Sequence, residues 1–236
     1  MKRILFLLCF GILFQCLAAE IFINVPRLDA EPPMNSAQAH SAWEQCAKFF
    51  GFRKLENQRP AENPTSYALG EYDGNLFIMI RCDYKAGKEV KLRQQVRTKD
   101  GKIFTDDSVD LAIALPGRPS KEYYQFTLNS INTRYDAHLV DIGWDGKWQS
   151  AAEYDSRGYT LFYKIPFSDF GLNQVPEELK MNIGRTVTGD ESEQSVLLHQ
   201  KNPDCFFLDM QSAVSLRFAP RSPVLAVTPG PEFEKG

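Results

Sequence analysis

The sequence contains few of the residues that hold metals. Among its 236 residues are 5 cysteines and 3 histidines. No two cysteines have CxxC spacing, and His40, His138 and His199 have no ligand-like partner three or four residues away. Zinc sites and dithiol redox sites need such spacings, so neither is expected. We therefore interpret the three histidines as surface or packing residues.

The short motifs of several enzyme and ligand-binding classes are also missing. There is no GxSxG elbow for a nucleophilic serine, and there is no glycine-rich loop for a phosphate. Positive charge is not in excess, because 27 basic side chains stand against 30 acidic ones. The densest basic stretch, residues 88–97, alternates like a strand with one solvated face. These features argue against a nucleic-acid partner.

Only one long apolar run is present, at residues 4–19. It follows Lys2 and Arg3 and ends in Ala18 and Ala19, the pattern of a signal peptide. The run lies too close to the start, and is too short, to favour a membrane span, and no other segment approaches ~20 apolar residues. We predict a signal peptide at 1–19 and an exported protein, periplasmic, cell-surface or secreted. Its removal takes away two basic residues and no acid, leaving a formal charge of −5.

The cysteines leave two questions open. Cys16 is less well placed for a lipid anchor, because Gln15 stands where a small residue is needed. After cleavage, Cys46, Cys82 and Cys205 remain. Three thiols allow one disulfide with one thiol left over, and the sequence does not select the pair.

From residue 65 onward the apolar residues alternate with a period of two. Turn sequences such as YDGN and WDGK separate the strand-length runs. About ten short strands with few helical periods predict an all-β fold, an antiparallel, jelly-roll-like β-sandwich. Residues 36–52 predict a short peripheral helix, capped by Ser36 or Ser41. The predicted strands lie within 66–84, 91–98, 108–115, 122–130, 134–140, 148–154, 159–167, 179–187 and 213–218.

Residues 20–218 are expected to form a single domain. Residues 219–236 contain four prolines and end in charged residues, which predicts a flexible tail. Within the domain, alternation in 122–130 would bury Tyr124, Phe126 and Leu128. The opposite face then carries an aromatic ring, two amides and a hydroxyl, the chemistry of a ligand surface: Tyr123, Gln125, Thr127 and Asn129.

Three acids lie around the start of one predicted strand. Asp106 and Asp107 are neighbours and would point to opposite sides of an extended backbone, which does not suit the facing carboxylates of a glycosidase. Turn formation is the simpler role for both. Asp110 lies inside the strand, where aspartate is disfavoured, and this suggests a specific role. A structural calcium ion held by these acids remains an alternative.

Five segments, in this order and spacing, resemble carbohydrate-binding module family 9 and its extracellular relatives. The resemblance covers about residues 26–218. It implies a β-sandwich that binds sugar without catalysis, attached to or secreted alongside glycoside hydrolases that degrade plant polysaccharide. The segments are 64–84, 103–115, 123–137, 144–172 and 180–186.

The resemblance also implies a site in which one sugar lies between two tryptophans. Phe104 stands in the place of the first, and Phe207, or its neighbour Phe206, in the place of the second. Two phenylalanines can still stack on a sugar ring, with less area than tryptophan. Either ring could instead be an ordinary core residue.

Three positions differ from the family pattern. Asp110 corresponds to an acid that is more often Glu, and Thr127 replaces an arginine and so removes a fork of donors. Phe162 stands where relatives usually carry Glu. Of the tryptophans, Trp43 and Trp148 are expected in the core, and Trp144 is expected to be exposed and to extend the platform.

The sequence thus predicts an exported carbohydrate-binding module without catalytic residues or cofactor. Two alternatives stay open: a glycoside hydrolase, and a cell-envelope interaction module that has lost sugar recognition. The predicted sugar-binding residues are Phe104, Asp110, Tyr123, Gln125, Thr127, Asn129, Trp144 and Phe207.

Overall fold

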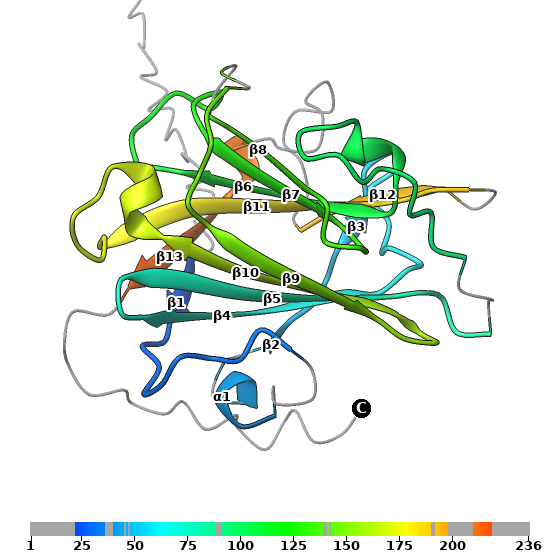
Figure 1. Ribbon diagram of the computed structural model, residues 1–236, viewed down its shortest axis with the longest axis horizontal. Coiled ribbons are helices and arrows are strands. Elements are labelled where there is room, and N and C mark those ends of the chain that lie inside the picture. The colour runs from blue at the N-terminus through cyan, green and yellow to red at the C-terminus, as the bar shows by residue number, and fades with distance from the viewer. Residues whose placement is uncertain are drawn as a thin grey trace, which may run out of the picture.

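The computed structural model is a sandwich of two β-sheets (Figure 1). The predicted all-β sandwich is confirmed. The predicted signal peptide, the predicted tail, Cys205 and Phe207 lie outside the residues that the structure describes. The described residues are 22–35, 40–44, 46, 48–87, 91–138, 141, 143–189, 192–197 and 210–218.

The larger sheet carries the candidate site. Its neighbours are antiparallel except β1 and β13, which run parallel. A side branch, β12 (Glu193–Val196) and β3 (Arg53–Lys54), joins it along β11. The strand order is β1 (Phe22–Val25), β13 (Val214–Phe218), β11 (Glu178–Val187), β6 (Ser108–Ala114), β7 (Tyr124–Asn129) and β8 (Arg134–His138).

The smaller sheet packs against it. The predicted YDGN turn joins its strands β4 and β5, with Asp73 and Gly74 both at positive φ, as a two-residue hairpin requires. The helix α1 (His40–Glu44) lies beneath this sheet, on the side away from the larger one (Figure 1). The order is β2 (Lys48–Phe49), β4 (Thr65–Tyr72), β5 (Asn75–Asp83), β10 (Gly158–Pro166) and β9 (Gln149–Tyr154). Three short 3-10 helices complete the described elements: η1 (Ile103–Thr105), η2 (Phe167–Phe170) and η3 (Met210–Ser212).

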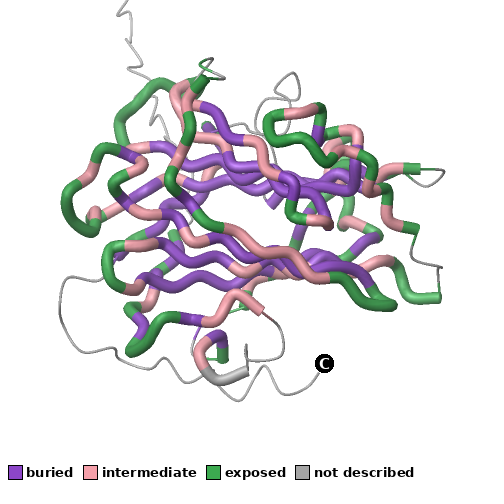
Figure 2. The backbone as a smooth tube through the Cα atoms, viewed as in Figure 1, coloured by how far each residue is buried: buried purple, intermediate pink, exposed green. Residues whose placement is uncertain are grey.

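Alternating apolar side chains fill the space between the sheets. Val109, Leu111 and Ile113 of β6 are buried in one core cluster with Leu76, Ile78 and other residues of the smaller sheet. Figure 2 shows buried backbone along the central strands of both sheets. Because side chains on a strand alternate, the even-numbered residues of β6 lie on the outer face of the larger sheet.

Two predicted core tryptophans are confirmed. Trp148 is buried and stacks on Tyr163, with ring centroids 5.8 Å apart. Trp43 is buried in a second cluster on the outer face of the smaller sheet, where its ring lies 6.4 Å from that of Phe162. Phe162 is therefore a packing residue under the N-terminal segment.

One predicted strand is wrong. Residues 91–97 form no strand, although their side chains alternate. The backbone N–H groups of Arg93 and Val96 donate to carboxylates, those of Asp107 and Asp106, instead of to a neighbouring strand. Alternation within a single segment does not reveal which groups will satisfy its backbone.

The two described cysteines are buried free thiols. Cys46 lies in the cluster around Trp43, and Cys82 lies in the interior between the sheets. Burial raises the pKa of the Cys46 thiol to about 11. A bridge between these two residues, one of the pairings that the sequence left open, is not formed.

Arg185 of β11 links the two sheets from within. It has no exposed surface, and its Nη1 donates to the carbonyl oxygens of Asn63 and Pro64, at 3.2 and 3.0 Å, and to Thr65 Oγ1 at 3.1 Å. The rings of Tyr84 and Tyr159 have centroids 5.4 and 5.5 Å from its guanidinium carbon. The sandwich is held at this end by a buried cation as well as by apolar packing.

Candidate functional site

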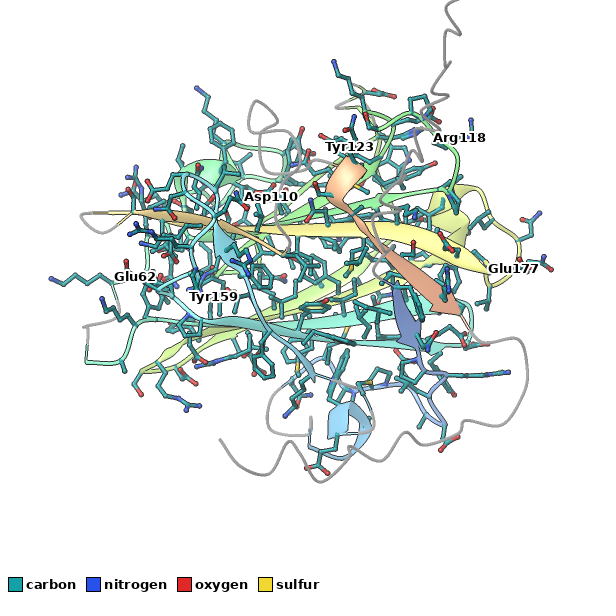
Figure 3. All side chains as sticks on the ribbon, turned by 180° about the vertical axis from the view of Figure 1, so that it is seen from behind. Glu62, Asp110, Arg118, Tyr123, Tyr159 and Glu177 are labelled. Carbon is teal, nitrogen blue, oxygen red and sulfur yellow. The ribbon has the colours of Figure 1, made fainter. Side chains whose placement is uncertain are left out.

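The candidate site lies on the outer face of the larger sheet. In the strand register, Asp110 stands between Gly184 of β11 and Thr127 of β7, and Thr127 is paired in turn with Tyr135 of β8. Figure 3 shows Asp110 and Tyr123 on the side of this sheet that faces away from the smaller one. The prediction that Asp110 lies on the face opposite the buried apolar residues of its strand is therefore confirmed.

The Asp110 carboxylate is held by two neighbouring side chains. Thr127 Oγ1 donates to Asp110 Oδ1 at 2.6 Å, and Gln125 Nε2 donates to the same oxygen at 2.8 Å. Gln125 Nε2 also lies 3.3 Å from Thr127 Oγ1. Within the described part of the chain, Asp110 Oδ2 accepts no hydrogen bond. Three of the predicted residues thus meet, and they leave one carboxylate oxygen available to a ligand.

Burial makes this carboxylate unusual. Asp110 is only 5% exposed. Burial raises its pKa, and the hydrogen bonds from Thr127 and Gln125 act in the opposite direction. No lysine or arginine among the described residues forms an ion pair with it. A buried, uncompensated acid with a free oxygen is the kind of group that marks a functional site.

Two tyrosines lie near Asp110. Tyr123, directly before β7, packs against Ala112, Ala114 and Met210 and is half-buried. Burial raises the pKa of its hydroxyl, and the charge of Asp110 adds to the effect. Tyr135 is also half-buried, and its pKa is raised by burial, with the charges of Asp100, Asp110 and Asp136 adding.

The sequence reasoning did not select Tyr135. Local polarity gave no signal for it, because the apolar Tyr135 and Ala137 lie on the outer face while the polar Arg134 and Asp136 lie on the inner one. Pairing of this strand with β7 then places the ring beside Thr127.

Phe104 is solvent-exposed in η1, one turn before β6. Its side chain is 63% exposed, so its alternative assignment as a core residue is wrong. It lies six positions before Asp110 on a segment that leads directly into the strand of the site. Its predicted partner, Phe207, lies outside the described residues, so the pair of stacking rings stays a prediction.

Trp144 does not extend the Asp110 surface. Its ring packs edge-on against Tyr124 and Phe126, at centroid distances of 5.2 and 5.8 Å. These residues alternate with Gln125 and Thr127, so Trp144 lies on the opposite side of the sheet from Asp110. The backbone of its loop is tied to that side, where Gly146 N donates to Asp136 Oδ2.

Asn129 shares the outer face but has no free hydrogen-bonding group. It is fully buried. Its Nδ2 donates to Val96 O at 2.9 Å and to Asp106 Oδ2 at 3.1 Å, and its Oδ1 accepts from the backbone of Ile131 and Thr133. Its side chain fixes the end of the β7–β8 hairpin, and we remove it from the set of sugar contacts.

The neighbouring acids also hold backbone. Asp106 and Asp107 are fully buried. Asp106 accepts from Val96 N, and Asp107 accepts from Arg93 N. Asp107 Oδ1 also accepts from Thr188 N at 2.8 Å. Both acids therefore anchor chain segments around the start of β6, a firmer role than the turn formation predicted for them.

No metal site is evident in the described ranges: no three His, Cys, Asp or Glu side chains gather there as a metal ion requires. Calcium stays a prediction from sequence.

Two hollows lined by described residues lie away from Asp110. One, of about 290 Å³, is bordered by basic side chains at the β7–β8 turn; the other, of about 410 Å³, lies at the β11–β12 hairpin. The first has three cations in its lining, Arg97, Lys99 and Arg134. Lys99 is already engaged with Asp100, Asp136 and Asp145. Neither hollow is lined by a predicted sugar-binding residue, so the Asp110 face is kept as the candidate site.

Comparisons by sequence identify no relative. No protein-family model matches the chain. No curated protein matches it at a significant level. Any assignment therefore depends on the fold.

Solved structures match the fold over most of the chain. A family 9 carbohydrate-binding module from Caldicellulosiruptor kristjanssonii in complex with glucose has a TM-score of 0.63 and 10% identity, covering 86% of this chain and 98% of that one. The fold is that of a family 9 carbohydrate-binding module. A structure of such a module from the same organism with cellotriose gives 0.57 and 10%, covering 89% and 100%. A candidate carbohydrate-binding protein from Bacteroides uniformis gives 0.65 and 13%, covering 85% and 100%.

The family 9-like fold agrees with the resemblance seen in the sequence, although identity with these structures is low. Among the described residues, no helix has the length and apolar character needed to cross a membrane.

Proposed function

We propose that this protein binds carbohydrate, without catalysis, on the outer face of its larger sheet at Asp110. The observation that carries the proposal is the free Oδ2 of a buried carboxylate, set among Gln125, Thr127 and half-buried tyrosines. The fold supports it, because structures of similar fold hold glucose and cellotriose.

The chemistry of binding follows from the groups present. Asp110 Oδ2 accepts a hydrogen from a sugar hydroxyl, and the Gln125 amide and Thr127 hydroxyl hold the carboxylate in place. Aromatic rings, Tyr123 and the exposed Phe104, offer apolar surface to the C–H face of a sugar ring. Each hydroxyl contact replaces a contact with water, for a net gain of ~0.5–1.5 kcal/mol. Binding of a single sugar unit is therefore expected to be weak.

A catalytic role has little support in the geometry. A glycosidase needs a second carboxylate across the sugar, ~5–10 Å from the first. The nearest acids in sequence, Asp106 and Asp107, are buried and bound to backbone N–H groups. Neither of these two acids is therefore free to act as the catalytic partner of Asp110.

We also infer that the protein is exported and assists associated glycoside hydrolases in polysaccharide breakdown. The support is the basic pair and apolar run at residues 2–19, and the resemblance to modules that accompany such enzymes. N-terminal sequencing of the exported protein would test the predicted cleavage after Ala19.

The alternative is a cell-envelope interaction module that keeps the fold without sugar recognition. Thr127, in the place of an arginine, favours it, because a donor fork is missing. Such a module would bind no glycan, whereas our proposal expects a measurable response to cellotriose in calorimetric titration.

Phe104→Ala tests the aromatic platform. Removing a stacking ring is expected to weaken binding of cellotriose by up to ~10-fold, since such contacts contribute ~0.5–1.5 kcal/mol. Stability should not change, because the ring is 63% exposed. Calorimetric titration and thermal unfolding of the variant give both quantities.

Phe50→Ala is the matched control, since Phe50 is another phenylalanine, 69% exposed, beside the edge strand β2 of the other sheet. It should bind like the wild type. Equal affinity of the Phe104→Ala variant and the wild type would remove Phe104 from the site.

A further inference from the structure

We propose that the Asp110 site is selective for a protonated amino group, and that its preferred ligands are 2-amino-2-deoxy sugars such as β-1,4-linked glucosamine. The inference rests on the proposed sugar-binding function and specifies the substrate class of that site. Three observations on the outer face of the larger sheet support it: the charge balance, the number of free acceptor atoms and the aromatic neighbours.

The charge of Asp110 has no cation to balance it among the described residues of this face. The residues paired across the sheet at the level of Asp110 are Gly184, Thr127 and Tyr135, and none is positively charged. The next level on the same face contains Asn182, Ala112 and Gln125, also without positive charge. Lys180 lies one level beyond these, opposite Ala114. Its Nζ is engaged with Glu178, 3.4 Å away, and with Ser215 Oγ. A buried carboxylate of this kind favours a ligand that brings its own positive charge.

The number of free acceptor atoms on Asp110 also favours an amino sugar over a neutral sugar. A neutral sugar binds a carboxylate best through two adjacent hydroxyls, one on each oxygen. Here Oδ1 already accepts from Thr127 and Gln125, so only Oδ2 remains. A single oxygen suits an ammonium group, because the attraction between opposite charges adds to the hydrogen bond, whereas a neutral hydroxyl supplies the hydrogen bond alone.

The aromatic neighbours suit the same ligand. Tyr123 and Tyr135 are close enough to Asp110 for its charge to raise the pKa of both hydroxyls, and both rings are half-buried. A cation near the face of a tyrosine ring is attracted by its electrons, most strongly where water is excluded. A carboxylate with neighbouring phenol rings is therefore an environment for an ammonium group.

Three trisaccharides of the same linkage test the inference by calorimetric titration. Cellotriose, the glucosamine trimer and the N-acetylglucosamine trimer differ only at C2, which carries a hydroxyl, an ammonium or an acetamide. At a pH where the amine is protonated, the glucosamine trimer is expected to bind ~10-fold more tightly than cellotriose or the acetylated trimer. Added salt should weaken binding of the glucosamine trimer and leave cellotriose unaffected.

Asp110→Asn should remove both the preference and its salt dependence, while Asp29→Asn should keep them. Asp29 is an exposed acid in the N-terminal segment, so its replacement changes the net charge equally. Equal binding of cellotriose and the glucosamine trimer by the wild type would overturn the amino-sugar proposal and leave the proposed function intact. A preference that survives in Asp110→Asn would also overturn it, because the charge would then act elsewhere. If none of the three trimers binds, the proposed function fails as well.

Discussion

Asp110→Asn is expected to lower the affinity for a neutral glucan such as cellotriose by ~10-fold, because a sugar hydroxyl loses its charged acceptor. Asparagine has the shape of aspartate, and its oxygen can still accept from Thr127 and Gln125. The variant therefore removes the charge of the site without removing its internal contacts. Calorimetric titration of wild type and variant measures the difference.

The same variant is expected to be more stable than the wild type at neutral pH. Folding buries the Asp110 carboxylate, and its pKa rises above the ordinary value of 3.8. Between that value and the raised one, the folded state binds more protons than the unfolded state, so the wild type loses stability as pH increases. The variant has no such group. Its advantage in melting temperature should therefore grow from pH 3.8 toward neutral pH.

A different result would change the role given to Asp110. If the variant bound cellotriose like the wild type, the free Oδ2 would not be a ligand contact. If the variant instead unfolded more readily at neutral pH, the charged form would be a structural requirement of the fold. Thermal unfolding across the pH range, in the absence of sugar, separates the stability question from binding.

Arg185→Ala is expected to lower the free energy of unfolding by about 3 kcal/mol or more, the range seen when a buried hydrogen-bonded charge network is broken. The substitution removes three hydrogen bonds that cross from β11 to the start of β4, and the contact with two tyrosine rings. The carbonyl oxygen of Asn63, in a buried contact, would lose this donor, whereas that of Pro64 would keep the N–H of Asp83. Urea unfolding followed by tryptophan fluorescence measures the loss, since Trp148 is buried in the same core.

Arg157→Ala is the control for this variant. Arg157 is exposed in the turn between β9 and β10, where a surface substitution is expected to change stability by ~0.5 kcal/mol or less. Similar losses for both variants would mean that the cross-sheet contacts of Arg185 contribute little beyond an exposed arginine.

Local alternation predicted the sheets and the face of the site well. In β6 and β7 the period-two alternation of apolar and polar residues assigned the inward and outward side chains correctly, because one face of each strand is packed against a second sheet. The same rule places Gln125 and Thr127 beside Asp110 once the strands pair. These parts depend only on side-chain polarity and short turns, which the sequence contains.

The errors arose where distant segments decide the outcome. Asn129 was placed on the correct face, but the oxygen of Val96 and the acid Asp106 bind its amide. Trp144 belongs to a loop, and alternation does not apply to loops. Its position follows from carboxylates on β8 and η2: Asp136 and Asp169 bind the N–H groups of Gly146 and Lys147. Such long-range pairings leave no periodic signal in the local sequence.

The parallel pairing of β1 with β13 has a consequence for how the molecule is made. Phe22 lies beside Ser215, so one side of the larger sheet is completed by segments from opposite ends of the domain. During synthesis, β1 lacks its partner in the sheet until β13 emerges, and Glu178–Met181 of β11 keeps an open edge for the same period. An unpaired edge can recruit strands from other molecules. The nascent protein is thus expected to be prone to aggregation until β13 has paired.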